Sequence, residues 1–312
     1  MLNTLYENDL LDWAGLDASA VRAKFASIKT LVTEPAVALV EHIEVPGPAG
    51  GIACRLYHPD PGTPLPLLVW LHGGGWVLGT LDGEEGTSRL LADAGPVAIL
   101  SVDYRLAPEH PFPAAVEDAL ACFDWACAHT AQLRVGVVGI GGCSAGGNLA
   151  AVVSLERAAG DLPGPVHQLL VYPIADCALD RASMQAFGEG LVLHRDHMQW
   201  FWDQYVPSVH DRTNWRASPV HADIPASIAP ATVLLAACDP LVDEGMAYAA
   251  ALRVAGASVR CTVGQGLTHG FVGMCRRVPA AKALVLEAIG TVAAAMRGCQ
   301  LSRASAEPDR TG

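Results

Sequence analysis

Short apolar runs alternate with amphipathic segments along most of the chain. Residues 40–45 and 52–57 alternate between apolar and polar positions on either side of a Pro/Gly-rich turn, which predicts an antiparallel hairpin. Fully apolar runs predict buried strands, and stretches with helical periodicity predict helices between them. The predicted strands are residues 67–71, 97–102, 135–140, 166–172, 232–237 and 259–263, and the predicted helices are residues 114–128, 149–159, 245–254 and 280–296. This rhythm predicts an α/β fold, with a mostly parallel sheet covered by helices on both faces and the hairpin at its edge.

Three segments fall outside this rhythm. Residues 1–33 carry apolar side chains at mixed helical spacings, which predicts a helical N-terminal segment. Residues 180–217 contain a predicted helix rich in aromatic side chains, which is either a lid beside a catalytic edge or ordinary packing on the core. Residues 299–312 are polar and predict a loose C-terminal tail.

The composition restricts the class of protein. The 312 residues are 51% hydrophobic and 17% charged, which excludes a disordered chain. The formal net charge of −12 argues against nucleic acid and anionic membrane surfaces as partners and favours a small neutral substrate. Nine cysteines without a paired spacing indicate reduced thiols. Because no signal peptide and no uninterrupted apolar segment of membrane-spanning length is visible, we expect a cytoplasmic protein without a membrane span.

The sequence Gly142-Cys143-Ser144-Ala145-Gly146 lies between a predicted strand and a predicted helix. A serine flanked by glycines at such a junction is typical of the nucleophile elbow of hydrolases. The turn is so tight that positions beside the serine must lack bulky side chains, and glycine meets that requirement. The pattern therefore predicts Ser144 as an exposed nucleophile.

A serine hydroxyl needs a base to take its proton and an acid to orient that base. Asp239 directly follows the predicted strand 232–237, and His269 lies in the loop after the next strand. Since the carboxyl ends of parallel strands meet at one edge of a sheet, we expect these two side chains to lie near Ser144. Asp243 and Glu244 come a turn later and are typical of the acidic first turn of a helix.

The run His72-Gly73-Gly74-Gly75-Trp76 directly follows the strand at residues 67–71. Acyl transfer places negative charge on an oxygen, and glycines allow backbone N–H groups to approach that oxygen closely. A loop of this kind, together with the N–H after the nucleophile, forms the oxyanion hole of lipases and esterases. In this chain the later N–H belongs to Ala145.

Two glycine patterns and one histidine pair lack the residues that a binding motif needs. The run that begins at Gly139 resembles a dinucleotide fingerprint, but its sixth position is Ser144. The glycines from 142 to 147 have phosphate-loop spacing, but Asn148 replaces the required lysine. His194 and His197 lack the glutamate and spacing of a zinc-binding helix. The sequence therefore predicts neither a cofactor nor a metal.

Several separate blocks occur in one order, within a match that extends over roughly residues 40–295. They are His72-Gly73-Gly74-Gly75, Tyr104 to Glu109, Gly142 to Asn148, Asp239 to Gly245, and His269-Gly270-Phe271. In this combination the chain resembles the bacterial hormone-sensitive-lipase-like branch of the α/β-hydrolases. The resemblance implies the α/β-hydrolase fold, a mostly parallel twisted sheet flanked by helices. It implies that residues 46–179 and 218–298 form the catalytic domain, and that residues 1–45 and 180–217 form a helical cap over the acyl pocket.

The resemblance also implies roles for individual residues. It makes Ser144 the nucleophile, His269 the general base and Asp239 the acid that orients the base. It places the oxyanion donors at Gly74, Gly75 and Ala145, and supporting residues at His72, Gly73, Glu109 and Cys143. The family usually has aspartate where this chain has Cys143, so we hypothesise that Cys143→Asp raises the melting temperature or the turnover. We expect apolar pocket lining from Trp76, Trp202, Tyr205 and Leu241.

These expectations together describe a serine carboxylesterase that acts on small neutral esters with short to medium acyl chains and needs no cofactor. Two alternatives use the same fold. An amidase or acyl-peptidase has the same three catalytic side chains, and its leaving-group preference lies in the cap. A non-catalytic small-molecule receptor is disfavoured because this chain keeps its serine, aspartate and histidine. Members of the family are often dimers, so a homodimer is a further expectation.

Overall fold

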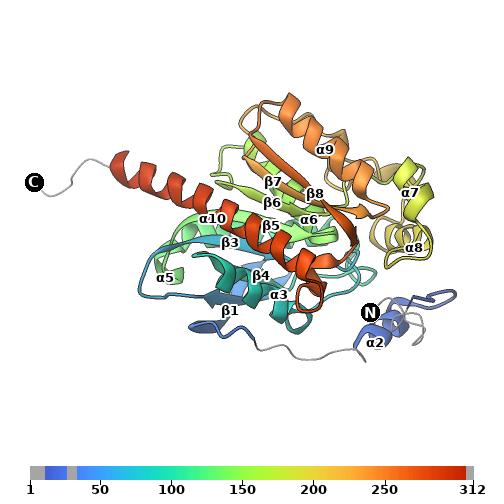
Figure 1. The fold of residues 1–312 in the computed structure, drawn as a ribbon, viewed down its shortest axis with the longest axis horizontal. Coiled ribbons are helices and arrows are strands. Elements are labelled where there is room, and N and C mark those ends of the chain that lie inside the picture. The colour runs from blue at the N-terminus through green and yellow to red at the C-terminus, as the bar shows by residue number, and fades with distance from the viewer. Residues whose placement is uncertain (1–10, 27–33, 307–312) are drawn as a thin grey trace, which may run out of the picture.

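The computed structural model describes residues 11–26 and 34–306 (Figure 1). Its centre is an eight-stranded sheet with the order β1-β2-β4-β3-β5-β6-β7-β8. The strands are β1 (Leu39–Gly47), β2 (Gly50–His58), β3 (Leu65–Leu71), β4 (Ala98–Val102), β5 (Val135–Cys143), β6 (Gln168–Val171), β7 (Ala231–Cys238) and β8 (Val259–Thr268). The hairpin β1–β2 and the β2–β4 pair are antiparallel, and every later pair is parallel. The predicted α/β-hydrolase fold, with its antiparallel edge, is therefore confirmed.

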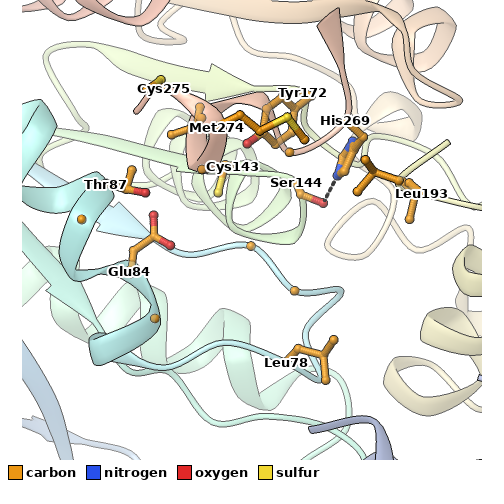
Figure 2. Close-up of a pocket in the computed structure, with 18 of the residues that line it drawn as sticks. Leu78, Glu84, Thr87, Cys143, Ser144, Tyr172, Leu193, His269, Met274 and Cys275 are labelled. Atoms are coloured by element: carbon orange, nitrogen blue, oxygen red, sulfur yellow. Dashed lines mark hydrogen bonds between the residues drawn. The ribbon is translucent and has the colours of Figure 1, made fainter. Parts of the chain in front are cut away.

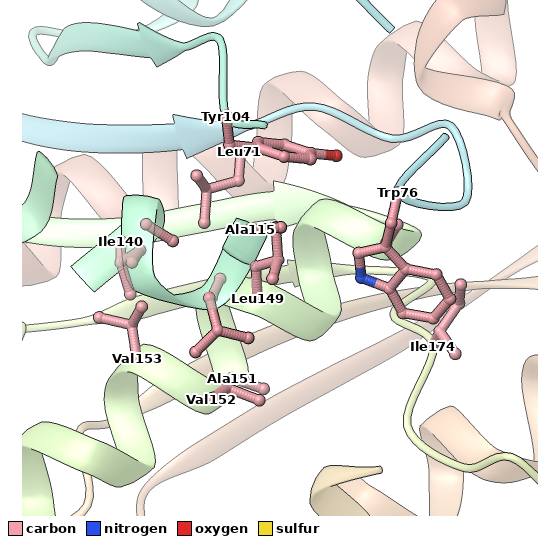
Figure 3. Packing of buried hydrophobic residues seen from close by; sticks show 14 of the residues in the cluster. Leu71, Trp76, Tyr104, Ala115, Ile140, Leu149, Ala151, Val152, Val153 and Ile174 are labelled. Atoms are coloured by element: carbon pink, nitrogen blue, oxygen red, sulfur yellow. The ribbon is translucent and has the colours of Figure 1, made fainter. Parts of the chain in front are cut away.

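Helices cover both faces of the sheet. They are α3 (Leu81–Ala94), α4 (Ala114–Ala128), α5 (Thr130–Leu133), α6 (Ala145–Ala159), α9 (Val242–Val254) and α10 (Pro279–Ala306). Strand β3 shows how the two cores are separated, because its side chains alternate between them. Leu67, Val69 and Leu71 join the core beneath α4, α6 and α9, while Leu68 and Trp70 join the core beneath α3 and α10. Figure 3 shows the first of these cores, where Leu71 and residues of α6 pack together.

Three helices surround the carboxyl-end edge of the sheet: α2 (Ala18–Ala26), α7 (Ala182–Phe187) and α8 (Arg195–Tyr205). Trp13, which precedes α2, stacks on His197 of α8 with ring centroids 3.8 Å apart. The Nε2–H of His197 donates to the carbonyl of Leu11 at 2.8 Å. The N-terminal segment and α8 therefore pack against each other. Residues 1–10 and 27–33, which belong to the helical segment predicted at residues 1–33, lie outside the described residues.

Two helices differ from the prediction. Helix α3 was not predicted, because Gly83 and Gly86 are poor helix formers. Thr80 caps the start of this helix by accepting the N–H of Gly83 at 3.1 Å. Helix α10 continues to Ala306, so the loose tail predicted from residue 299 is wrong as far as residue 306. The side-chain amide of Gln300 donates to the carbonyl of Pro64 at 2.9 Å, a tertiary contact that the polar composition does not reveal.

Within the described residues, α10 includes a 24-residue stretch, Pro279–Ser302, that has the length and composition to cross a membrane. Its buried side chains recur at helical spacing on one face: Ala281, Val285, Ala288, Ile289, Val292, Ala293 and Met296. They belong to the core formed with β3, β5 and α3. This is the pattern of a helix packed on a sheet.

Candidate active site

Ser144 is the single residue between the end of β5 and the start of α6. Its backbone has φ 55° and ψ −118°, a conformation that non-glycine residues rarely adopt. Glycine is required on both sides, because a Cβ at Gly142 would lie 2.6 Å from the Leu71 carbonyl oxygen and one at Gly146 would lie 2.5 Å from that of His72. The elbow predicted from the glycine spacing is thus a strained turn that presents the serine side chain at the sheet edge.

The structure brings Ser144 together with the two partners predicted from distant parts of the chain. Asp239 directly follows β7, and His269 directly follows β8. The Nδ1 of His269 lies 2.8 Å from Oδ2 of Asp239, and its Nε2 lies 3.0 Å from Oγ of Ser144 (Figure 2). Because a carboxylate only accepts hydrogen bonds, Nδ1 carries the proton and Nε2 is free to accept the serine O–H. All three side chains are buried.

The neighbouring carboxylates have other partners. Oδ2 of Asp243 accepts the backbone N–H of Ser183 at 2.8 Å. Oε1 of Glu244 accepts the N–H of Ala175 at 2.8 Å, and burial raises the pKa of this carboxyl well above its usual range. Both residues therefore fix loops around the sheet edge, and Asp239 is the acid that faces His269.

The loop after β3 packs directly against the elbow. A Cβ at Gly73 would lie 3.2 Å from Sγ of Cys143 and 3.4 Å from Cβ of Ser144. Gly74 and Gly75 have φ values of 118° and 58°, so the loop runs through conformations that favour glycine. An added Cβ would meet the Leu78 backbone at the first position and the Phe201 ring at the second.

His72 holds this loop in place. Its Nδ1–H donates to the carbonyl of Gly73 at 2.8 Å, and Tyr104 donates its hydroxyl to the carbonyl of His72 at 2.8 Å. The two rings are stacked with centroids 4.3 Å apart. Burial lowers the pKa of His72 to about 4, which keeps the ring neutral at physiological pH. Ala145, the first residue of α6, has a backbone N–H without an intrahelical acceptor.

A cavity of about 1190 Å³ contains Ser144 and His269 in its lining. The N-terminal segment, α8 and the loop before α8 line it with apolar side chains, among them Leu11, Trp13, Phe25, Leu193, Met198 and Phe201. Helix α3 and the segment around Phe271–Met274 contribute Glu84, Thr87, Met274 and Cys275, with Cys143 and Tyr172 beside them (Figure 2).

The lining differs from the one predicted. Trp76, Trp202, Tyr205 and Leu241 are fully buried in the core and are not part of the cavity lining. Trp76 stacks on Tyr205 with centroids 4.2 Å apart, so these aromatics support α8 from below. The sequence missed Glu84 and Thr87 because it did not predict α3, and it missed Tyr172 because nothing in the pattern distinguishes the end of β6.

Known proteins are similar to this chain over most of its length. A family model described as the alpha/beta hydrolase fold matches residues 68–273. The chain belongs to the α/β-hydrolase family, in its hormone-sensitive-lipase-like branch. It is 44% identical over 267 residues to the carboxylic ester hydrolase LipN of Mycobacterium tuberculosis, covering 83% of this chain and 71% of LipN. It is 38% identical over 226 residues to an ethyl acetate hydrolase of Pseudomonas putida, covering 70% and 71% of the two chains. A solved hyperthermophilic esterase from the archaeon Pyrobaculum calidifontis superposes with a TM-score of 0.88 at 35% identity, covering 96% of each chain.

Of the supporting residues predicted for this hydrolase, Cys143 lines the cavity and Glu109 does not. The carboxylate of Glu109 binds Arg22 of α2 at 2.7 and 2.8 Å, and Arg22 also donates to the carbonyls of Val77 and Ala107. Glu109 therefore connects α2 to the core and does not line the cavity. Cys143 does line it, and burial raises the pKa of its thiol, with the charge of Glu84 adding to the effect.

Asn148 is a further polar residue that fixes the elbow of this hydrolase. Its side-chain amide is fully buried and donates to the carbonyls of Ile174 and Ala217 at 2.9 and 2.8 Å. It thereby ties the first turn of α6 to the loop after β6 and to the segment that follows α8.

Among the described residues, one cluster has donor atoms close enough for a metal ion. Asp176, Cys177 and His221 each offer a ligand atom, and these atoms lie within 4.8 Å of one another. The carboxylate of Asp176 already pairs with Arg181 at 2.5 Å. Since a guanidinium competes with a cation for the same oxygens, the cluster is better explained as an ion-pair network.

Proposed function

We propose that this carboxylic ester hydrolase works through Ser144, His269 and Asp239 by way of an acyl-enzyme. The observation that carries the proposal is the continuous hydrogen-bonded line from the serine hydroxyl through the imidazole to the carboxylate. Ser144 attacks the ester carbonyl while Nε2 of His269 takes the serine proton. Asp239 holds the imidazole in the tautomer that accepts this proton, and it stabilises the imidazolium that forms.

The negative charge of the tetrahedral intermediate needs preorganised donors. The proposed donors are the backbone N–H groups of Gly74, Gly75 and Ala145, because the glycine loop and the first turn of α6 both border the nucleophile. The imidazolium then gives its proton to the alcohol, which leaves. Water repeats the same steps on the acyl-enzyme and releases the acid.

Substrate class follows from the lining of the cavity and from the relatives. The relatives are named carboxylic ester hydrolase and ethyl acetate hydrolase, which supports esters as substrates. The proposed cap consists of the N-terminal segment with α7 and α8, and its apolar side chains at the cavity suit short to medium acyl chains. A homodimer stays a prediction from the family, to be checked by light scattering.

The test is a panel of p-nitrophenyl esters graded by acyl length, with matching anilides, on wild type and Ser144→Ala. We expect ester hydrolysis by the wild type, a rate maximum at short or medium chains, and little anilide hydrolysis. Ser144→Ala is expected to lose activity by several orders of magnitude while leaving a residual rate about 10³–10⁴-fold over water. Faster cleavage of anilides would favour an amidase, and a Ser144→Ala variant with unchanged turnover would refute the mechanism.

A further inference from the structure

The two sides of the cavity differ in chemistry. The N-terminal segment and α8 present apolar side chains to it, whereas α3 presents the carboxyl group of Glu84 and the hydroxyl group of Thr87. Figure 2 shows both side chains on α3, facing Cys143 across the space beside Ser144, while Leu193 lies on the far side of His269. Gly83 and Gly86 on the same helix also line the cavity and keep this part of it open.

Among the described residues, Glu84 differs from its neighbours Asp82 and Glu85 on α3 in having no cationic partner. Asp82 pairs with Arg55 at 2.9 Å, and Glu85 pairs with Arg55 and, at 2.6 Å, with Arg89. In the part of the chain that the structure describes, no lysine or arginine forms an ion pair with Glu84. Within the described ranges, its carboxyl group accepts hydrogen bonds only from neutral donors.

These neutral donors are Trp70 and Thr87. The indole N–H of Trp70 donates to Oε1 of Glu84 at 2.8 Å, and the Thr87 hydroxyl bonds to the same carboxyl group. Burial raises the pKa of Glu84, and these two hydrogen bonds act in the opposite direction. A carboxylate withdrawn from water is costly unless a charge of the opposite sign compensates it. Arg276 and Lys282 line the same cavity, but among the described residues no ion pair supplies such a charge at Glu84, so this part of the cavity is complementary to a cation on a ligand.

We infer that the α3 side of the cavity is a subsite for an ammonium group, so that Glu84 selects esters that carry a protonated amine on their acyl or alcohol part. This inference rests on the proposed esterase function and specifies its substrate class. The net charge of −12 also favours a cationic substrate, because it attracts cations to the protein. Glu84 acts here as a specificity residue, since the bond-making steps belong to Ser144 and His269.

The experiment compares isosteric esters that differ only in a terminal group. One series consists of p-nitrophenyl heptanoate, ω-hydroxyhexanoate and ω-aminohexanoate, and a second places the methyl or ammonium terminus on the alcohol of a butanoate ester. Assays near pH 8 keep a primary amine charged, because its pKa is about 10.4. The measured quantity is the ratio of kcat/KM for the ammonium ester to that for the methyl ester within each variant.

Three variants make the ratio diagnostic. Glu84→Gln keeps an acceptor for Trp70 but removes the charge, Glu84→Asp keeps the charge, and Glu41→Gln removes an exposed acid on β1 that is remote from the cavity. We expect the wild type to favour the ammonium ester in one series. The ratio should fall about 10–100-fold in Glu84→Gln, the effect of losing a hydrogen bond to a charged group, and persist in the other two variants.

An unchanged ratio in Glu84→Gln would overturn the inference, as would equal preference for ammonium and methyl esters in both series. Preference for the hydroxyl ester over the ammonium ester would overturn the assignment of a charged ligand. A binding measurement distinguishes failure of this inference from failure of the proposed function. In Ser144→Ala, hexylammonium should raise the melting temperature more than hexanol does, and adding Glu84→Gln should abolish the difference. If that difference is found while folded wild type hydrolyses no ester, the subsite stands and the esterase mechanism falls.

Discussion

Gly146→Ala is expected to displace Ser144, the proposed nucleophile, without changing any of the three proposed catalytic side chains. A Cβ at position 146 would lie 2.5 Å from the carbonyl oxygen of His72 and closer still to that of Leu71. Both are backbone atoms at the end of β3, so no side-chain rotation relieves the clash. The first turn of α6 must therefore move by more than 0.9 Å, because even the longer of these two contacts is 0.9 Å short of the ordinary contact distance of 3.4 Å. A misplacement of about 1 Å costs about 10²-fold in rate, and overpacking costs about 1–3 kcal/mol of stability.

The assay measures kcat/KM on a short-chain aryl ester, the rate at which a phosphonate labels Ser144, and the melting temperature. Both rates should fall by about 10²-fold in Gly146→Ala. Gly290→Ala is the matched control, because a Cβ there has no heavy atom within 4 Å and the residue lies inside α10. The control should gain up to about 1 kcal/mol of stability from helix propensity and keep wild-type activity. Wild-type labelling and turnover in Gly146→Ala would refute the idea that the elbow tolerates only glycine.

Three further predictions follow from buried or charged contacts. Asn148→Ala leaves two buried carbonyls without a donor and should lower the free energy of unfolding by about 2–4 kcal/mol, measured with urea; a change below that range would mean that water replaces the amide. Cys143→Asp should lower the melting temperature, against the expectation from sequence, because Glu84 would repel a second carboxylate, and Glu84→Gln should reverse the loss. If the single variant is stabilised, Glu84 does not act on position 143. Arg22 lowers the pKa of Glu109 from 4.5 to about 2, so this contact stabilises the fold above pH 4.5 and is lost as the pH falls towards 2. Over that pH range the melting temperature of the wild type should fall more than that of Glu109→Gln. Parallel curves of melting temperature against pH for the two proteins would contradict this prediction.

The sequence by itself determined the features whose signals are local. Apolar runs such as residues 67–71 are strands because a chain buried on both faces must be apolar throughout, and that requirement is visible residue by residue. The elbow could be predicted for a similar reason, since the steric limits at Gly142 and Gly146 act within a few residues of Ser144. Asp239 and His269 could be selected because each follows a predicted strand, and parallel strands end at one edge.

Only the tertiary structure decided which side chains meet. The 2.8 and 3.0 Å separations at His269 depend on how β5, β7 and β8 align, which the local pattern does not encode. Trp202 and Tyr205 were predicted as pocket lining, yet the orientation of α8 turns them into the core and presents other residues to the cavity. Glu84 gave no signal in the sequence because its helix, which contains two glycines, was not predicted. Its significance comes from what surrounds it, since a carboxylate is distinctive only where burial and the absence of a cation leave its charge uncompensated.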